Sequence, residues 1–110
     1  MAGGTDTREW TIKAGGISPW RMKELQAMCR QHGRLARGTP AQRARARLIE
    51  QAARETQGGQ WYRALMDNAC RGVRYEHLEV EALKSSNRNA YFAARREFFS
   101  RLDELTGGAD

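Results

Sequence analysis

Residues 87–106 read NRNAYFAARREFFSRLDELT, and the hydrophobic pattern of this run decides the fold. At 100° per residue, an α-helix over the run gathers its aromatic and aliphatic side chains on one face. That face comprises Tyr91, Ala94, Phe98, Leu102 and Leu105, with Phe92 and Phe99 beside it. A stripe of this width can pack against two other helices, so it predicts the last helix of an all-α protein.

The opposite face of the same helix carries a row of small and polar residues: Asn89, Ala93, Arg96 and Ser100. Their spacing of i, i+4, i+7 and i+11 keeps them in one line along the helix. Asparagine can bond an adenine edge, and arginine a guanine edge, through two hydrogen bonds, while alanine lets the backbone approach a base. The row therefore predicts a DNA-reading face, with an ordinary solvent-exposed helix face as the alternative.

Charge is unevenly distributed along this region. Every charged residue from position 84 to position 96 is basic, namely Lys84, Arg88, Arg95 and Arg96, and the acids follow. A recognition helix reads DNA with its N-terminal turns. Cations at a helix start oppose the helix dipole by about 0.3–1 kcal/mol each, which a bound phosphate would offset. This charge pattern therefore favours a helix that inserts into a DNA groove over a helix that only faces solvent.

Cap and stop residues predict the helices that precede this one. Ser-Pro and Thr-Pro pairs begin two of them, because the first residue caps the helix and proline suits its first turn. The expected ranges are 18 to 33 or 37, 39 to about 56, 60–71, and 75 to about 83 before the polar turn Lys84-Ser85-Ser86. They predict a compact all-α bundle of four to five helices in one domain, residues 17–106, preceded by a flexible Gly-rich arm over residues 1–16.

Three pieces of the C-terminal third resemble a known family. They are GVRYEHL at residues 72–78, KSS at 84–86 and RNAYFAARREFF at 88–99. Together they resemble the C-terminal helix-turn-helix of small prophage-encoded regulators, which is in turn similar to the promoter-binding region 4 of sigma factors. In such units a Tyr-x-x-aliphatic segment packs the first helix, and two aromatic pairs flanking an arginine pair build the second.

The resemblance implies a helix-turn-helix at about residues 73–105 that binds double-stranded DNA, with a role in transcription or phage development. The DNA-contacting residues expected on it are Lys84, Ser85, Ser86, Arg88, Asn89, Ala93 and Arg96. A second copy of the chain on a two-fold site, and RNA polymerase or another protein, are the further candidate partners.

The chain as a whole is basic. It has 19 Lys and Arg against 13 Asp and Glu, a formal net charge of +6. Such an excess attracts polyanions without specifying which one. Arg43, Arg47 and Arg54 fall at i, i+4 and i+11 on one polar face of the second predicted helix. They are expected to contact DNA phosphates, and a solvated arginine face is an equal alternative.

Several other classes of protein are disfavoured. No glycine pair has the context of a phosphate loop, and neither histidine belongs to a nucleophile–base pattern, so an enzyme is not expected. Cys29 and Cys70 are expected to be buried free thiols in a reducing compartment. With His32 and His77 they fit no common zinc spacing, so neither a metal nor a cofactor is predicted. No apolar run approaches the ~20 residues of a membrane span and no signal peptide is recognisable, which predicts a cytoplasmic protein.

The main alternative function is a protein-interaction module, such as a phage-encoded inhibitor or a helical subunit of a nucleoprotein complex. Its interface anchors would be the aromatic residues Trp10, Trp20, Trp61 and Tyr62, because such side chains dominate binding hot spots. RNA binding is disfavoured, since the aromatic residues fall on apolar helix faces rather than on exposed stacking surfaces.

Overall fold

The computed structural model describes residues 16–78 and 88–107 of the chain. Its α-helices are α2 (Pro19–Arg30), α3 (His32–Leu35), α4 (Pro40–Glu55), α5 (Tyr62–Leu65) and α7 (Arg88–Leu105). Shorter elements lie between them: a 3-10 helix η1 (Thr56–Gly59), a π-helical turn η2 (Met66–Cys70) and a 3-10 turn η3 (Tyr75–His77). The described residues contain no β-strand, as the all-α prediction requires.

The first two long helices begin at the predicted caps. Ser18 Oγ accepts the backbone N–H of Arg21 at 3.1 Å at the start of α2. At the start of α4, Thr39 and Gln42 form a capping box, in which each side chain accepts the backbone N–H of the other residue. A cap of this kind satisfies N–H groups that have no partner inside the helix. Both starts are therefore fixed by local hydrogen bonds that the sequence alone predicts.

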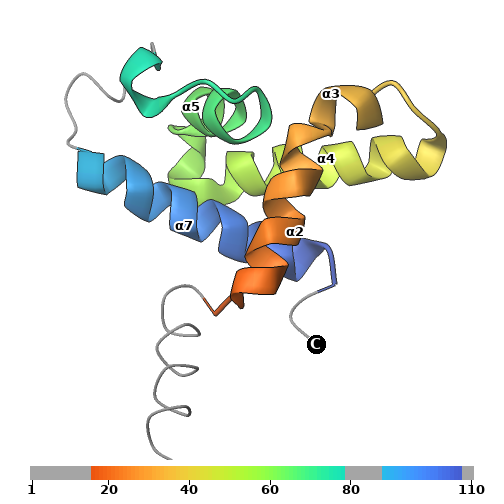
Figure 1. Cartoon of the computed structure of the whole chain (residues 1–110), viewed down its shortest axis with the longest axis horizontal. Coiled ribbons are helices and arrows are strands. Elements are labelled where there is room, and N and C mark those ends of the chain that lie inside the picture. The colour runs from red at the N-terminus through yellow and green to blue at the C-terminus, as the bar shows by residue number, and fades with distance from the viewer. Residues whose placement is uncertain (1–15, 79–87, 108–110) are drawn as a thin grey trace, which may run out of the picture.

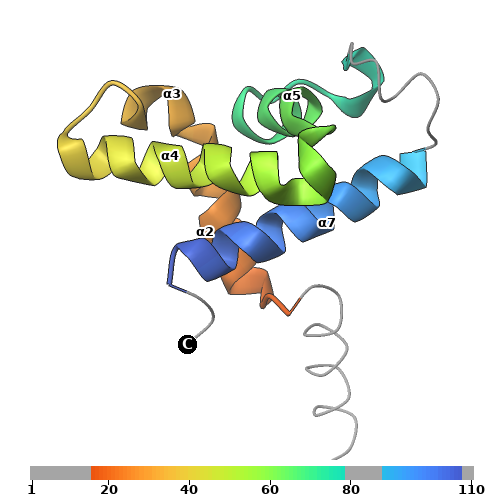
Figure 2. The same cartoon turned by 180° about the vertical axis from the view of Figure 1, so that it is seen from behind.

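The helices form two layers (Figures 1 and 2). α4 and α7 lie side by side and run in opposite directions, and α2 crosses over both of them, with α5 and η2 beside it. Arg21, at the start of α2, joins the end of α7 by bonding Asp103 Oδ1 through Nε at 2.6 Å. Near the other end of α4, Glu55 pairs with Arg101 of α7 at 3.7 Å. The first contact thus ties the two layers together at one edge, and the second ties α4 to α7 within one layer.

The predicted apolar face of α7 supplies the centre of the core. Tyr91, Ala94, Phe98, Phe99 and Leu102 are buried, and Phe92 and Leu105 pack against them half-buried. They meet buried side chains from every other α-helix, among them Leu25, Leu35, Ile49, Trp61 and Leu65. Burying one such side chain contributes about 1.5–3 kcal/mol, so this single shared core accounts for the compact fold.

In the first half of α4, the residues that face the core differ from those expected. Helical spacing in the sequence predicts an inward face made of Ala44, Leu48, Ile49, Ala52 and Ala53. In the structure Ala44 is exposed and Ala46 is buried instead. The reason is the crossing of α4 with α7, which leaves Ala44 and Leu48 lining an open groove beside Leu105 rather than a closed core. Towards its end, α4 buries Ile49, Ala52 and Ala53 as predicted.

The segment between α4 and α7 departs most from a regular helix. The predicted helix over 60–71 is a single α-helical turn, α5, followed by the π-helical turn η2. The predicted short helix from 75 to about 83 is, over its described part, the three-residue turn η3. Tyr75 of η3 stacks on Tyr91 and Phe92 of α7 with ring centroids 5.5 Å apart, so aromatic packing rather than helix length holds this segment. The predicted turn Lys84-Ser85-Ser86 lies outside the described residues.

Candidate nucleic-acid interface

The outer row of α7 faces away from the core. Asn89 and Arg96 are exposed, whereas Ala93 and Ser100 are half-buried. Neither Asn89 nor Arg96 has a side-chain hydrogen bond or ion pair with any described residue, so both keep their polar groups for solvent or a ligand. The row spans about 10 Å from Asn89 to Arg96, at 1.5 Å per residue, which is the length that two or three base edges occupy.

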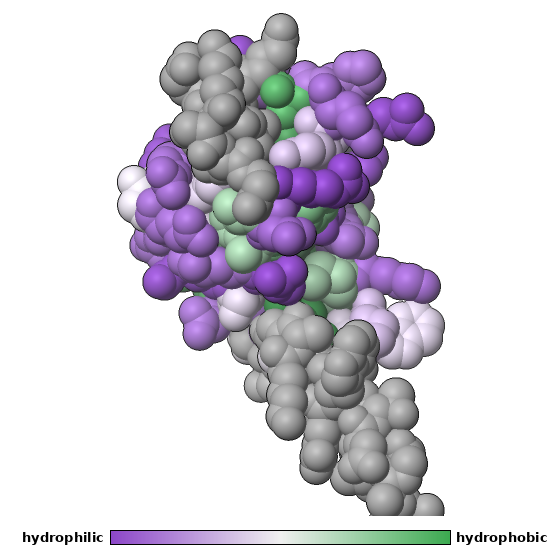
Figure 3. Space-filling view, turned by 90° about the vertical axis from the view of Figure 1, so that its left-hand side faces the viewer, coloured by the Kyte–Doolittle hydropathy of each residue, from purple (hydrophilic) through white to green (hydrophobic). Residues whose placement is uncertain are grey.

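Arg88 is on α7 but outside this row. Its guanidinium lies 5.0 Å from the Tyr75 ring and 5.1 Å from the Phe92 ring, and 4.0 Å from the Glu76 carboxylate. These contacts hold η3 against the first turn of α7. Figure 3 looks onto this end of the molecule, where hydrophilic residues surround smaller hydrophobic patches. Arg88 therefore has a structural use, although its side chain is still 61% exposed and can reach a phosphate.

The strongest concentration of charge lies elsewhere, where α3 meets the start of α4. Between Glu24 and Glu50 the chain has no acidic residue. We call five exposed arginines of this stretch the arginine corner: Arg34, Arg37, Arg43, Arg45 and Arg47. Arg43 and Arg47 share one face of α4, whereas Arg45 lies on the side of α4 that faces α2 and the end of α7. None of them forms an ion pair with a carboxylate among residues 16–78 and 88–107. The corner is thus a basic surface with no internal counter-charge.

Two of the corner arginines are held in place by neutral groups. Arg43 Nη1 donates to the carbonyl oxygen of Gly38 at 2.7 Å, and Arg45 Nη1 contacts Met28 Sδ at 3.6 Å. Such contacts orient a guanidinium without neutralising it. Sequence reasoning found Arg43 and Arg47 but missed the other three, and the signal that finds them is the absence of acids from positions 25 to 49.

Arg54 does not belong to the corner. It lies about 16 Å further along α4 than Arg43 at 1.5 Å per residue, with its guanidinium 5.0 Å from the Tyr62 ring and 4.0 Å from Glu50. The three phosphate contacts predicted on one helix face are therefore split between two places. Of the three, Arg43 and Arg47 share the unpaired surface and Arg54 has an acidic neighbour.

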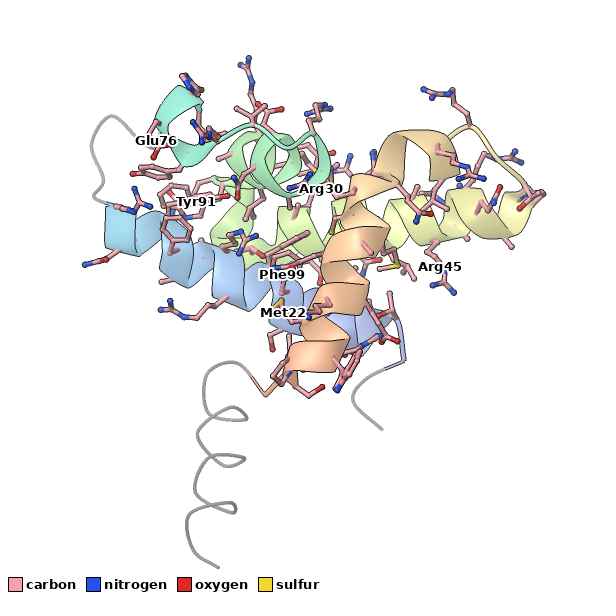
Figure 4. All side chains as sticks on the ribbon, in the orientation of Figure 1. Met22, Arg30, Arg45, Glu76, Tyr91 and Phe99 are labelled. Atoms are coloured by element: carbon pink, nitrogen blue, oxygen red, sulfur yellow. The ribbon has the colours of Figure 1, made fainter. Side chains whose placement is uncertain are left out.

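The corner and the start of the outer row lie at opposite ends of the molecule. α4 and α7 run antiparallel, so the first turns of α4 lie near the last turns of α7 (Figures 1 and 2). Figure 4 shows the same separation, with Arg45 far from Glu76 and Tyr91. α7 itself is about 27 Å long at 1.5 Å per residue. One ligand that touched both regions would have to be as extended as a turn of duplex DNA, about 34 Å.

The cysteines and histidines of the described residues form small, separate contacts. Cys29 and Cys70 are free thiols, and Cys70 Sγ donates to Met66 Sδ at 4.0 Å. The neighbouring Cys70 thiol and burial raise the pKa of Cys29. His32 Nε2 lies 2.8 Å from Glu50, and within residues 16–78 and 88–107 no three His, Cys, Asp or Glu side chains converge as metal ligands.

Two further observations bear on the class of protein. None of the described helices has the length and hydrophobicity needed to cross a membrane. Comparison with protein-family profiles, curated proteins and solved structures found no match for the chain. The surface chemistry of the chain itself is therefore the guide to its function.

Proposed function

We propose that this protein binds double-stranded DNA, using the arginine corner to grip phosphates and the outer row of α7 to contact bases. The observation that carries the proposal is the corner itself: five exposed arginines without a carboxylate partner among the described residues. Like charges without an acidic partner repel one another in the free protein. A polyanion relieves that repulsion and releases its own counterions when it binds.

The position of the corner on α4 adds to its affinity for phosphate. The first turn of α4 has no acidic residue, so nothing on it neutralises the positive end of the helix dipole. Backbone N–H groups at a helix start favour anions for the same reason. Arg43 and Arg47 follow within the next two turns. Phosphate contacts from this end would orient the protein on DNA without reading sequence.

Base contacts are assigned to α7 in this proposal. Asn89, Ala93 and Arg96 are the residues of the outer row whose side chains match base edges. The helix-turn-helix inferred from the resemblance is part of the proposal: α7 would be its second helix, and Lys84, Ser85, Ser86 and Arg88 would contact the DNA backbone beside it. The resemblance further favours a transcriptional or phage-development role. We place that role in the cytoplasm, with the protein acting as a monomer or as a dimer on a two-fold site.

One observation favours protein interaction as a second candidate function. Trp20 is 80% exposed, and it is the large hydrophobic side chain that the described surface leaves open. Tryptophan is the residue most enriched in binding hot spots. Of the other described anchors expected for such an interface, Trp61 is 2% exposed in the core, and Tyr62 is half-buried beside Arg54. The remaining aromatic surface is therefore small, and DNA binding is the function better supported.

The first experiment measures fluorescence anisotropy of a labelled random 25-base-pair duplex, titrated with the protein at several salt concentrations. Binding through several phosphates gives a log–log slope of affinity against salt of about −3 or steeper. The double variant Arg43→Gln/Arg47→Gln is expected to flatten that slope by about 0.9 for each phosphate that the variant no longer neutralises, on every duplex sequence alike.

A matched control removes the same charge elsewhere. Arg63 and Arg71 lie on α5 and after η2, and both pair with Asp67. Arg63→Gln/Arg71→Gln therefore lowers the net charge equally without touching the corner, and it should leave the slope close to that of the parent protein. Absence of binding at low salt, or an equal change in both double variants, would contradict a specific role for the corner.

A further inference from the structure

A second basic site, separate from the arginine corner, lies where α2, η2 and α7 meet. The three elements enclose a surface pocket of about 350 Å³. Its polar lining residues are Lys23, Gln26, Arg30, Asn68 and Arg95, and Phe99 lines it as well. In Figure 4, Arg30 and Phe99 both lie beside α2 on the side that faces α5. The pocket lining thus combines three cations and two amides without a carboxylate.

Arg95 is held in a fixed position at this pocket. Its Nε donates to Asn68 Oδ1 at 3.0 Å, and its guanidinium stacks on Phe99 with 5.0 Å to the ring centroid. Asn68 is fixed in turn, because Nδ2 donates to the carbonyl oxygen of Val73 at 2.8 Å and Oδ1 also accepts from Tyr91 Oη at 2.9 Å. The two Nη groups of Arg95 have no partner among the described residues. A guanidinium that is already oriented loses little entropy when it binds a ligand.

Arg30 reaches the same region from α2. A Cβ at Gly72 would lie 3.3 Å from Arg30 Nη1, so the side chain extends across to the chain that follows η2. The neighbouring Cys70 thiol and burial raise the pKa of Cys29, while the charges of Arg95 and Arg30 act in the opposite direction. None of the three pocket cations pairs with a carboxylate of residues 16–78 or 88–107. Positive charge has therefore gathered here without a protein counter-ion.

The geometry points to a binding pocket for a phosphoryl group between α2, η2 and α7. A guanidinium donates two parallel hydrogen bonds to a tetrahedral oxyanion, an ammonium adds a point charge, and neutral amides complete the donor set. The half-buried Arg95 gains most, because a partly desolvated cation is stabilised by an opposite charge beside it. The phosphoryl group could belong to a small phosphate ester or to the backbone of DNA. The pocket can bind a phosphoryl group whether or not the arginine corner binds DNA.

Isothermal titration of the full chain with inorganic phosphate, at constant ionic strength, tests the pocket. We expect saturable binding of one phosphate per chain. Arg30→Gln and Lys23→Gln change exposed side chains that make no hydrogen bond to the core, so both variants should fold. Arg30→Gln should weaken phosphate binding by about tenfold or more, whereas Arg63→Gln, which removes the same charge outside both the pocket and the arginine corner, should change it less than about twofold. Absence of saturable binding, or an equal loss in Arg63→Gln, would overturn the inference.

The same variants distinguish the source of the phosphoryl group when they are titrated with the 25-base-pair duplex. If Arg30→Gln weakens binding of phosphate and leaves duplex affinity unchanged, the pocket takes a small phosphate ester. If it weakens both in parallel, the pocket holds a backbone phosphate. Phosphate binding that persists in a protein that binds no duplex would remove the proposed DNA-binding function and leave the pocket standing.

Discussion

Arg95 and Arg96 are neighbours in sequence, and the fold gives them different surroundings. Arg95 is half-buried, bonded to Asn68 and stacked on Phe99. Arg96 is exposed and has no polar partner among the described residues. The helical period alone places them 100° apart, at the margin of the apolar face and on the outer row respectively. Arg95 therefore connects helices through Nε and keeps only its Nη groups for the pocket, while the whole guanidinium of Arg96 faces solvent.

This difference predicts that alanine at the two positions changes different properties: the stability of the fold at Arg95 and the affinity for DNA at Arg96. Arg95→Ala removes a donor from the half-buried Asn68 oxygen and should lower the free energy of unfolding by about 1–3 kcal/mol. Arg96→Ala should leave stability within about 0.5 kcal/mol, yet cost about 1–3 kcal/mol on the preferred duplex and relax base preference there. Urea denaturation and anisotropy on selected and random duplexes measure the two effects. If Arg96→Ala weakened all sequences equally, the base-reading assignment would be wrong.

The helices differ in how well the local sequence explains where they begin and how regular they are. α4 begins at the capping box of Thr39 and Gln42 and runs uninterrupted to Glu55. α5 lasts one turn before η2 widens it into a π-helical turn, and no residue pattern in 60–71 announces that change. A π-helical turn is a local insertion tolerated where packing demands it. Here it coincides with Asn68, whose side chain reaches Val73, Tyr91 and Arg95.

Removal of the cap on α4 tests how much these local hydrogen bonds stabilise the helix. Thr39→Ala deletes the oxygen that accepts the Gln42 N–H, and should lower the free energy of unfolding by about 0.5–2 kcal/mol. Thr39→Ser keeps an acceptor at the same place and should remain close to the parent protein. Chemical denaturation followed by circular dichroism compares the three. Equal stability of all three proteins would show that the capping box contributes nothing measurable.

At the scale of the whole molecule, one core joins every helix. Phe98 of α7 is fully buried among side chains from both layers, and Trp61, which follows η1, is buried in the same cluster. A chain with one such core is expected to unfold in a single cooperative step. The same arrangement sets α4 and α7 antiparallel, and so places the arginine corner and Asn89 at opposite ends.

Phe98→Ala tests whether the core is shared. It should lower the free energy of unfolding by about 3–5 kcal/mol, because it leaves a cavity that the surrounding helices cannot fully close. Phe92→Ala, at the half-buried rim, should cost clearly less. Tryptophan fluorescence and far-ultraviolet circular dichroism should report the same midpoint in each variant. Two separated transitions would mean that the helices belong to more than one folding unit.

The predicted interface was only partly accessible to sequence reasoning. The outer row of α7 and the exposure of Arg43 and Arg47 follow from helical periodicity, which is a local property. The pocket between α2, η2 and α7 does not, since Arg30 and Arg95 are 65 positions apart and meet only through the packing of three elements. Contacts between residues so distant along the chain depend on how the helices cross, which no local pattern encodes.

By itself, the sequence determined that the chain is helical, where α2 and α4 begin, and which face of α7 enters the core. Caps and apolar spacing act within a few residues, so they can be read before any fold is known. The tertiary structure alone decided that Ala44 remains exposed, that Arg54 leaves the arginine corner, and that three cations gather around one pocket. These features arise from the angles at which helices pack, and they therefore exist only in the assembled core.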